Sequence, residues 1–310
     1  MPEILTLTAN PALDIATATE IIEPSRKLRC EAPRYDPGGG GINVARAAHM
    51  LGGGAVAVFP AGGASGQMIE ALLRQEGVLN VAVPVPGITR ESLAVVERQS
   101  GKQYRFLLPG PELRARDQER LLAALAAQIT PETRFVVASG SLPPGAPVDF
   151  YHRVAELARQ RGARFALDTS AAALTSAGAG IFLIKASLRE LSQLRGAAVA
   201  GDVALEQAAR TVIAEGRCEV LVVSLGADGA LLATTDGCRR FPAARIAAIG
   251  SVGAGDSMLA GMLVALARDW ELAEAVRFGV AAGSAALLRP GTELCRREDT
   301  ERLYRELAST

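Results

Sequence analysis

The chain has 310 residues, enough to bury a large core, and we expect one main domain over residues 1–310. Its 33 Lys and Arg balance 33 Asp and Glu, so no long-range field draws it to nucleic acid or to an anionic membrane. Glycine or charge interrupts the apolar runs before the ~18 residues that suggest a membrane span, and the N-terminus lacks the pattern of a signal peptide. We therefore expect a cytoplasmic protein without nucleic-acid or membrane partners, in which any phosphate site is local.

Cysteine and histidine are too sparse for several kinds of chemistry. The four cysteines are widely spaced without a Cys-x-x-Cys pair, and the chain has two histidines. This pattern disfavours a zinc site or a disulfide framework and favours cysteines packed as small apolar residues. No nucleophile-elbow sequence is present, so Ser-His-Asp hydrolysis is also disfavoured.

Short apolar runs alternate with amphipathic segments along the chain. The runs predicted as buried strands are Ile4–Thr8, Val56–Pro60, Phe135–Ala138, Phe165–Leu167, Ile181–Ile184 and Val220–Ser224. The predicted helices are Asn43–Leu51, Met68–Gln75, Gln118–Gln128, Phe150–Gln160 and Leu205–Glu215, with three more from Ala254, Leu272 and Arg297 after a turn at 234–237. This alternation predicts an α/β fold, with a mainly parallel sheet covered on both faces and ligands at the carboxyl ends of its strands.

Two stretches, 17–35 and 90–108, do not follow this alternation. In the second, Ser92–Arg98 and Gln103–Leu108 flank a Ser-Gly pair and predict a β-hairpin. We interpret 15–35 and 88–110 as two segments of a small β-strand lid or dimer surface, although an ordinary edge hairpin gives the same pattern.

A glycine-rich stretch precedes the helix that begins near Ala254. Its small residues bring backbone N–H groups together at a helix start, where they and the helix dipole favour an anion. The amides of Gly253, Ala254 and Gly255 could hold a phosphoryl group, and Asp256 could take the proton of the acceptor. A helix-capping aspartate would give the same local pattern, so both interpretations of Asp256 stay open.

A second glycine run lies at 38–41, directly before another helix. Four absent side chains let a ligand lie against the backbone, and Asn43 could cap the helix or bind a sugar hydroxyl. Neither run has the G-x-x-x-x-G-K-[ST] spacing of a P-loop. The G-x-G-x-x-G spacing expected after the first strand of a dinucleotide fold is also missing, which disfavours NAD binding.

These pieces follow one another in an order that resembles the ribokinase-like carbohydrate kinase family over nearly the whole chain. The motifs are Asp14, GGGGINVAR at 38–46, SGSLPPG at 139–145, VSLGADGA at 223–230 and VGAGD at 252–256. Within the family, TLTANPALD, KLRC, PGGGGINVARA, FPAGGASG, VRFGVAAGSAA and GT-x-LC are similar to the type 2 (minor) 6-phosphofructokinases. The resemblance implies the ribokinase-like three-layer fold with a small β-strand lid.

The resemblance also implies a reaction and an acceptor site. The γ-phosphoryl group of ATP would pass to the 1-hydroxyl of fructose 6-phosphate in glycolysis, with Asp256 as the base and the amides of 253–255 around the migrating group. The sugar hydroxyls would contact Asp14, Gly39, Gly40, Gly41, Asn43 and Ser139. The 6-phosphate would be bound by Arg90, with Lys27 or Arg29 from the lid. A homodimer through the lid strands is implied as well.

The nucleotide and metal sites follow from the same resemblance. ATP would contact Lys185, Ser187, Ser224, Leu225, Gly226, Gly229, Gly283 and Ser284. Glu190 would act on Mg²⁺, directly or through water, as this hard cation keeps much of its hydration. Backbone carbonyls near Gly250, Val252, Ala286, Arg289 and Gly291 would hold a monovalent cation such as K⁺.

The chain departs from the family pattern at several positions. Ser187 stands where many relatives have Asn, Gly250-Ser251 where Asp-Thr is more frequent, and Ala12 where type 2 enzymes often have Ser. The stretch NPALD at 10–14 is closer to 1-phosphofructokinases and tagatose-6-phosphate kinases. Those relatives usually have Lys in place of one of the four glycines, which favours fructose 6-phosphate here.

Two further hypotheses belong to other classes. A non-catalytic sensor of sugar phosphate or nucleotide predicts loss of the base, whereas Asp256 is present in an intact VGAGD. A nucleoside kinase is disfavoured because a nucleoside offers no phosphate to Arg90 and Lys27.

Overall fold

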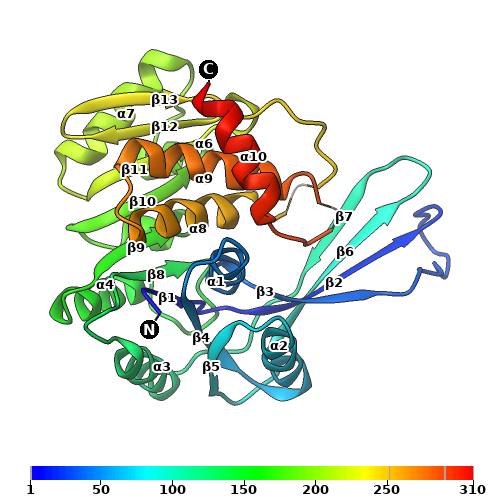
Figure 1. Cartoon of the computed structure of the whole chain (residues 1–310). Coiled ribbons are helices and arrows are strands. Elements are labelled where there is room, and N and C mark those ends of the chain that lie inside the picture. Colours follow the sequence, from blue (N-terminus) through cyan, green and yellow to red (C-terminus); the bar gives the residue numbers. More distant parts are fainter. Residues whose placement is uncertain (1, 251, 290, 310) are drawn as a thin grey trace.

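The computed structural model describes residues 2–250, 252–289 and 291–309, which form a large α/β body with a small projecting sheet (Figure 1). In the described residues the main sheet has nine strands in the order β13-β12-β11-β10-β9-β8-β1-β4-β5, and all pairs are parallel except those of β12 and β13. Its strands are β1 (Ile4–Leu7), β4 (Ala55–Ala61), β5 (Leu79–Pro84), β8 (Phe135–Ser139), β9 (Arg164–Asp168), β10 (Ile181–Ser187), β11 (Cys218–Ser224), β12 (Ala230–Thr234) and β13 (Gly237–Phe241).

Helices cover both faces of the main sheet (Figure 1). One core lies under α1 (Gly40–Met50), α2 (Gly63–Gln75), α8 (Ala254–Ala267), α9 (Leu272–Ala286) and α10 (Arg297–Ala308). The other lies under α3 (Ala115–Gln128), α4 (Phe150–Gln160), α5 (Ala171–Thr175), α6 (Leu188–Arg195) and α7 (Asp202–Ala214). Alternate side chains of β8 pack into the two cores. Phe135 and Val137 lie in the first core, and Val136 and Ala138 lie in the second. The predicted three-layer α/β fold is confirmed.

The small sheet has the order β3-β2-β6-β7 and projects from the body beside α2 (Figure 1). Its strands are β2 (Ala12–Thr19), β3 (Arg34–Gly38), β6 (Arg90–Glu97) and β7 (Gln103–Leu107). β2 pairs with β6 in parallel and with β3 antiparallel, and β6 and β7 form the expected antiparallel hairpin. The predicted segment 88–110 contains β6 and β7, whereas segment 15–35 contains the end of β2, the start of β3 and the connection 20–33 between them. Their role as a lid stays a prediction.

The elements expected from the sequence do not include β5, α5, α6 or the strands β12 and β13, of which only the connecting turn at 234–237 was expected. β5 lies at the edge of the main sheet and is half exposed, so it lacks the continuous apolar run of a buried strand. α5 and α6 are short helices that follow the carboxyl ends of β9 and β10. None of the described helices is both long and apolar enough to cross a membrane.

Candidate active site

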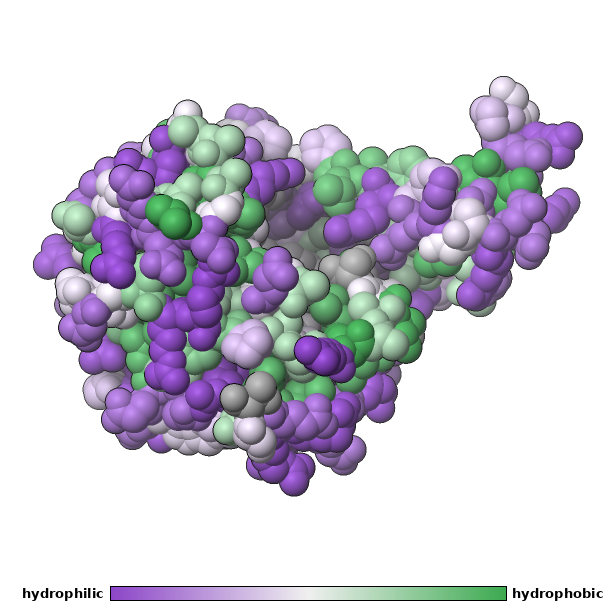
Figure 2. Space-filling model, turned by 90° about the horizontal axis from the view of Figure 1, so that it is seen from above, coloured by the Kyte–Doolittle hydropathy of each residue, from purple (hydrophilic) through white to green (hydrophobic). Residues whose placement is uncertain are grey.

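Two cavities adjoin the first turn of α8, and Figure 2 shows the surface hollowed where the small sheet leaves the body. The polar cavity, of about 470 Å³, is lined by Ala12, Asp14, Gly39, Gly40, Asn43, Arg90, Ser92, Arg105, Leu107, Ser139–Ser141, Asp168–Ser170, Glu190, Val252, Gly253 and Asp256. The apolar cavity, of about 540 Å³, is lined by Ser224, Gly226, Ala227, Gly229, Ala243–Ile246, Ala248, Ala254, Gly255, Met258, Val280, Gly283, Ser284 and Leu287. The start of α8 therefore borders both cavities.

Asp256 lies at the third position of α8, behind the N-cap residue Gly253. It is therefore not the cap of this helix. Its Oδ2 accepts a hydrogen bond of 3.0 Å from Nδ2 of Asn43 in α1. Burial, and then the nearby charge of Asp168, raise the pKa of Asp256 to about 6, against the lowering effects of Asn43 and Lys185. A carboxylate with this pKa is suited to accept a proton near neutral pH.

Gly253 has to be glycine for two reasons. Its φ of 75° lies in the left-handed region, and a Cβ built there would lie 2.4 Å from Cδ2 of Leu294. The left-handed turn allows the chain to enter α8 with the amides of its first turn at the rim of both cavities. This arrangement has the geometry expected of an anion site at a helix start.

The small sheet supplies Asp14, Ser92, Arg90 and Arg105 to the polar cavity. Burial raises the pKa of Asp14 to about 6, although a hydrogen bond with Ser92 and the charges of Arg105 and Arg90 lower it. Nη2 of Arg90 donates to the carbonyl oxygen of Asn10 at 3.1 Å. The cavity thus places two guanidinium groups and a carboxylate on one wall.

The glycine run forms another wall, at the start of α1. A Cβ on Gly40 would lie 2.3 Å from Oγ of Ser139 at the end of β8, so only a glycine allows this approach. Gly41 instead faces the body, where a Cβ would lie 2.5 Å from the carbonyl oxygen of Leu7. The glycine run therefore borders the cavity at Gly40 and packs against the body at Gly41.

The residues expected from the sequence divide into three groups. Those that line the polar cavity are Asp14, Gly39, Gly40, Asn43, Arg90, Ser139, Glu190, Val252, Gly253 and Asp256. Those that line the apolar cavity are Ser224, Gly226, Gly229, Ala254, Gly255, Gly283 and Ser284. The lining of neither cavity includes Lys27, Arg29, Gly41, Lys185, Ser187, Leu225, Gly250, Ala286, Arg289 or Gly291.

Several of the last group are nevertheless close to the site. Nζ of Lys185 forms an ion pair of 2.9 Å with Oδ2 of Asp168 and lies 2.6 Å from the position of a Cβ on Gly255. Burial alone would lower the pKa of Lys185, but the charges of Asp168, Asp256 and Glu190 raise it overall. A buried, charged ammonium group therefore lies against the helix start.

Lys27 and Arg29 lie in the exposed stretch between β2 and β3. In a single chain these two side chains do not line the polar cavity, where they were expected to bind a phosphate.

Ser187 and Glu190 form a capping box at the start of α6. Oε2 of Glu190 accepts from the amide of Ser187 at 2.7 Å and from its hydroxyl at 2.8 Å. The serine that replaces the family's asparagine thus holds the carboxylate directly while Glu190 lines the polar cavity.

Two of the residues expected to hold a monovalent cation have carbonyl oxygens near Gly250. A Cβ on Gly250 would lie 2.2 Å from the carbonyl oxygen of Arg289 and 3.9 Å from that of Ala286. Two of the expected carbonyl groups therefore converge on Gly250. Ser251, named above as a departure from the family, lies outside the described residues.

Arg105, Ser92 and Asp168 are cavity residues that the sequence analysis missed. Asp168 directly follows the predicted strand Phe165–Leu167, so the rule that ligands bind at carboxyl ends of strands could have found it. Arg105 and Ser92 depend on the pairing of β2, β6 and β7, in which Ser92 lies beside Asp14.

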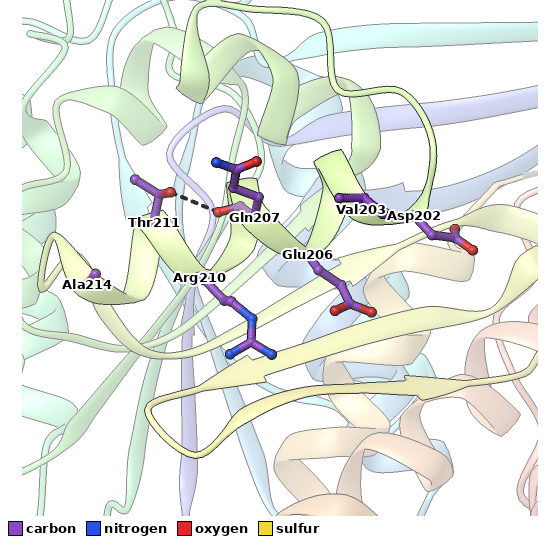
Figure 3. Close-up of a pocket in the computed structure, with 7 residues that line it drawn as sticks. All are labelled: Asp202, Val203, Glu206, Gln207, Arg210, Thr211 and Ala214. Carbon is purple, nitrogen blue, oxygen red and sulfur yellow. Dashed lines mark hydrogen bonds between the residues drawn. The ribbon is translucent and has the colours of Figure 1, made fainter.

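A further hollow of about 510 Å³ runs along α7 and contains none of the expected site residues (Figure 3). The hollow lies on the outer surface and is lined by Asp202, Glu206 and Arg210, of which Asp202 forms an ion pair with Arg240. We do not assign the site to this hollow because a single helix, α7, supplies all the residues that line it and none of them was expected at the site.

The parallel α/β body, the glycine-rich helix start and a carboxylate of raised pKa between a polar and an apolar cavity form the arrangement expected of a kinase. Residues 8–299 match the model described as pfkB family carbohydrate kinase. The chain belongs to this family of carbohydrate kinases, as the sequence motifs predict.

Full-length relatives give the comparison more detail. The chain is 50% identical over 308 residues to ATP-dependent 6-phosphofructokinase isozyme 2 of Mycobacterium tuberculosis, covering 99% of this chain and 90% of the relative. It is 43% identical over 310 residues to the Escherichia coli K12 protein of the same name, covering 99% and 100%. A 1-phosphofructokinase of Xanthomonas campestris is 34% identical over 288 residues, covering 90% and 89%.

Solved structures of phosphofructokinase-2 from Escherichia coli superpose on the whole chain. The complex with potassium has a TM-score of 0.94 at 42% identity, covering 99% of this chain and 100% of the other. The complex with fructose-6-phosphate has a TM-score of 0.92 at 41% identity with the same coverage. A tetrameric inhibited form of that protein has also been solved, with a TM-score of 0.93 at 41% identity and the same coverage.

Proposed function

We propose that this protein is an ATP-dependent 6-phosphofructokinase that phosphorylates the 1-hydroxyl of fructose 6-phosphate and produces fructose 1,6-bisphosphate. The observation that carries the proposal is the position of Asp256, whose carboxylate lines the polar cavity at the helix start that also borders the apolar cavity. The full-length identity of 50% to a 6-phosphofructokinase, against 34% to a 1-phosphofructokinase, supports fructose 6-phosphate as the acceptor.

The reaction follows from the groups around α8. The 1-hydroxyl oxygen attacks the γ-phosphorus of ATP, the bond from that phosphorus to the bridging oxygen breaks, and ADP leaves. Asp256 takes the hydroxyl proton, and Asn43 holds the carboxylate toward the acceptor. The amides of Gly253, Ala254 and Gly255 stabilise the charge that spreads over the equatorial oxygens. Lys185 lies buried against Gly255 and adds a positive charge beside them.

The wall formed by Arg90 and Arg105 suits the 6-phosphate of the acceptor. Guanidinium groups bind phosphate through paired, charge-assisted hydrogen bonds. Asp14, which shares this wall, would accept from a sugar hydroxyl. Gly39 and Gly40 at the start of α1, and Ser139 at the end of β8, would also contact the sugar, whereas Gly41 would contribute through its backbone.

The apolar cavity suits the adenine ring, flanked by Gly283 and Ser284, with the loop from Ser224 to Gly229 beside the ribose and phosphates. Leu225 lies within this loop, where its amide donates to the carbonyl of Gly229 at 2.8 Å. Ser187 would not contact ATP itself but would hold the carboxylate of Glu190 in place.

Glu190 and Asp168 fit a magnesium ion that keeps most of its water, because both carboxylates line the polar cavity near the helix start. Mg²⁺ bound there would neutralise charge on the phosphates of ATP. The carbonyls of Ala286 and Arg289 beside Gly250 fit a monovalent cation, and a potassium complex of the Escherichia coli relative supports K⁺. Val252 and Gly291 complete the proposed cation segment.

We also propose a homodimer through the small sheet. Phe106 and Leu107 on β7 are 51% and 61% exposed, and Figure 2 shows apolar side chains along this projection. Lys27 and Arg29 are exposed there as well, so a second copy could receive them at its acceptor phosphate. A cytoplasmic location stays a prediction from the sequence.

The acceptor is tested by coupled assays with ATP and each of fructose 6-phosphate, fructose 1-phosphate, tagatose 6-phosphate and fructose. We expect the highest kcat/KM with fructose 6-phosphate and a far lower value with unphosphorylated fructose. Turnover of fructose 1-phosphate alone would contradict the proposal. Binding of sugar phosphate and nucleotide without any turnover would favour a sensor.

A further inference from the structure

Asp36 lies at the base of the small sheet, where β3 runs into the glycine run at the start of α1. The side chain is 5% exposed. Oδ1 accepts from Nε and Nη2 of Arg34 at 3.1 and 2.8 Å, and Oδ2 accepts a short hydrogen bond from the hydroxyl of Thr292. Nη1 of Arg34 also donates a hydrogen bond of 2.6 Å to Oε1 of Glu293. We call Arg34, Asp36, Thr292 and Glu293 the Asp36 link.

The Asp36 link joins two segments that are far apart in the sequence. On one side, Asp36 is two residues before Gly38 and pairs with Asp14 in the register of β2 and β3. Nη2 of the buried Arg46 in α1 lies 3.6 Å from Oδ1 of Asp36, and its Nη1 donates to the carbonyl oxygen of Pro37 at 3.0 Å. This side of the link is therefore fixed to the wall that binds the acceptor.

On the other side, the residues after Thr292 and Glu293 support the start of α8. Leu294 is 2% exposed and fills the space beside Gly253, where a Cβ would lie 2.4 Å from its Cδ2. The amide of Cys295 donates to Oγ of Ser257, the residue that follows Asp256. The link thus reaches the anion site through its supporting residues.

We propose that the Asp36 link positions the acceptor wall relative to the phosphoryl-binding helix start, an inference that rests on the proposed kinase function. None of its four residues lines either cavity, so it acts without touching substrate. Arg90 and Arg105 of the small sheet would hold the acceptor phosphate, whereas the lining of the apolar cavity comes entirely from the body. Loss of the link therefore leaves each binding site intact and disturbs the alignment of the hydroxyl with the γ-phosphorus, to which phosphoryl transfer is sensitive.

The decisive variant is Thr292→Val, which removes the hydroxyl donor but keeps the shape of the side chain. We expect kcat to fall about tenfold or more. The dissociation constants of fructose 6-phosphate and of a non-hydrolysable ATP analogue, each measured alone by calorimetry, should stay within about threefold of wild type. Thr292→Ser keeps the donor and should restore most of kcat.

A second pair of variants separates the link from a general loss of surface charge. Glu293→Gln weakens the contact with Arg34, and we expect a smaller fall in kcat with unchanged binding. The control is Arg297→Gln, because Arg297 forms an ion pair of the same 2.6 Å with Glu301 on the exposed face of α10 and lines neither cavity. Its kcat should equal that of wild type.

Wild-type kcat in Thr292→Val would overturn the proposal. So would a rate loss explained by weaker binding of either ligand alone, or by partial unfolding in a thermal melt. All assays contain potassium chloride, and rates are expressed relative to wild type with whichever acceptor wild type phosphorylates. A different acceptor would therefore contradict the proposed function and still leave the link tested.

Discussion

Asn43 and Asp256, 213 positions apart in the chain, are joined by a hydrogen bond of 3.0 Å from the amide of one to the carboxylate of the other. Asn43 lies in α1, directly behind the glycine run, and Asp256 lies in the first turn of α8. The contact brings the two glycine-rich helix starts into one site. It also keeps the carboxylate oriented toward the polar cavity, where an acceptor hydroxyl would lie.

Asp256→Asn should abolish most turnover and leave binding intact. The amide is nearly isosteric with the carboxylate but cannot take the proton, so we expect kcat to fall by about 10²–10⁴. Calorimetric dissociation constants for ATP analogue and fructose 6-phosphate should change little. Asp236→Asn, in the exposed turn between β12 and β13, is the matched control and should keep the wild-type rate. A near-normal kcat in Asp256→Asn would show that another group is the base.

Activity should decrease as the pH falls through about 6. Burial raises the pKa values of Asp14 and Asp256 to about 6, so both carboxyl groups take up protons below that pH. A protonated Asp256 cannot act as a base, and kcat/KM should therefore rise with pH between about 5 and 7 and then level off. The measurement is a pH profile of kcat and kcat/KM.

Asp14→Asn provides the comparison for this profile. The charge of Asp14 contributes to the raised pKa of Asp256, so its removal should shift the acidic limb of kcat to lower pH. A limb that stays in place would argue that Asp14 and Asp256 do not interact. Activity that remains constant down to about pH 5 in wild type would contradict the raised pKa of the base.

Arg105→Gln should weaken binding of the acceptor phosphate. Loss of a hydrogen bond to a charged group costs about 1.5–3 kcal/mol, so we expect KM for fructose 6-phosphate to rise about tenfold or more with a smaller change in kcat. Arg98→Gln is the control, because Arg98 follows β6 in the same hairpin but pairs with exposed Glu31. Equal effects on fructose and fructose 6-phosphate would exclude a contact with the phosphate.

Ser187→Ala should lower the stability of the protein. It removes the hydroxyl that caps α6 and contacts Glu190, and loss of such a cap costs about 1 kcal/mol in the free energy of unfolding. Urea denaturation monitored by circular dichroism measures the change. Ser187→Asn keeps a capping side chain and should retain most of the stability. An unchanged unfolding free energy in Ser187→Ala would mean that the capping box contributes nothing.

Most of the main sheet could be predicted because strands buried on both faces have continuous apolar sequences, as in Phe135–Ser139. The edge strand Leu79–Pro84 was missed, because the polar residue Asn80 leaves only a short apolar run in it. The helix starts around Asn43 and Asp256 could be identified from local glycine patterns. In contrast, the placement of Arg105 depends on strand pairing across the small sheet, which the local sequence does not encode.

The sequence at Ser187 and Glu190 fits two different patterns. Ser187 and Glu190 have the spacing of a capping box, yet the comparison with the family drew attention to the missing asparagine. The structure shows that the serine contacts the carboxylate through both its amide and its hydroxyl. A residue that departs from a family pattern can thus keep a local contact by a different hydrogen bond.

Asp14, Arg90 and Arg105 belong to the four-stranded sheet, whereas Gly226, Gly283 and Ser284 belong to the body. Under the proposed function, these three acceptor contacts are encoded in two short stretches of the chain, separate from those that would hold the nucleotide. An exchange of these stretches between relatives would be a route to a new acceptor preference without rebuilding the donor pocket. Diversification of sugar choice in such a protein can proceed in a sheet that lies outside the main packed layers.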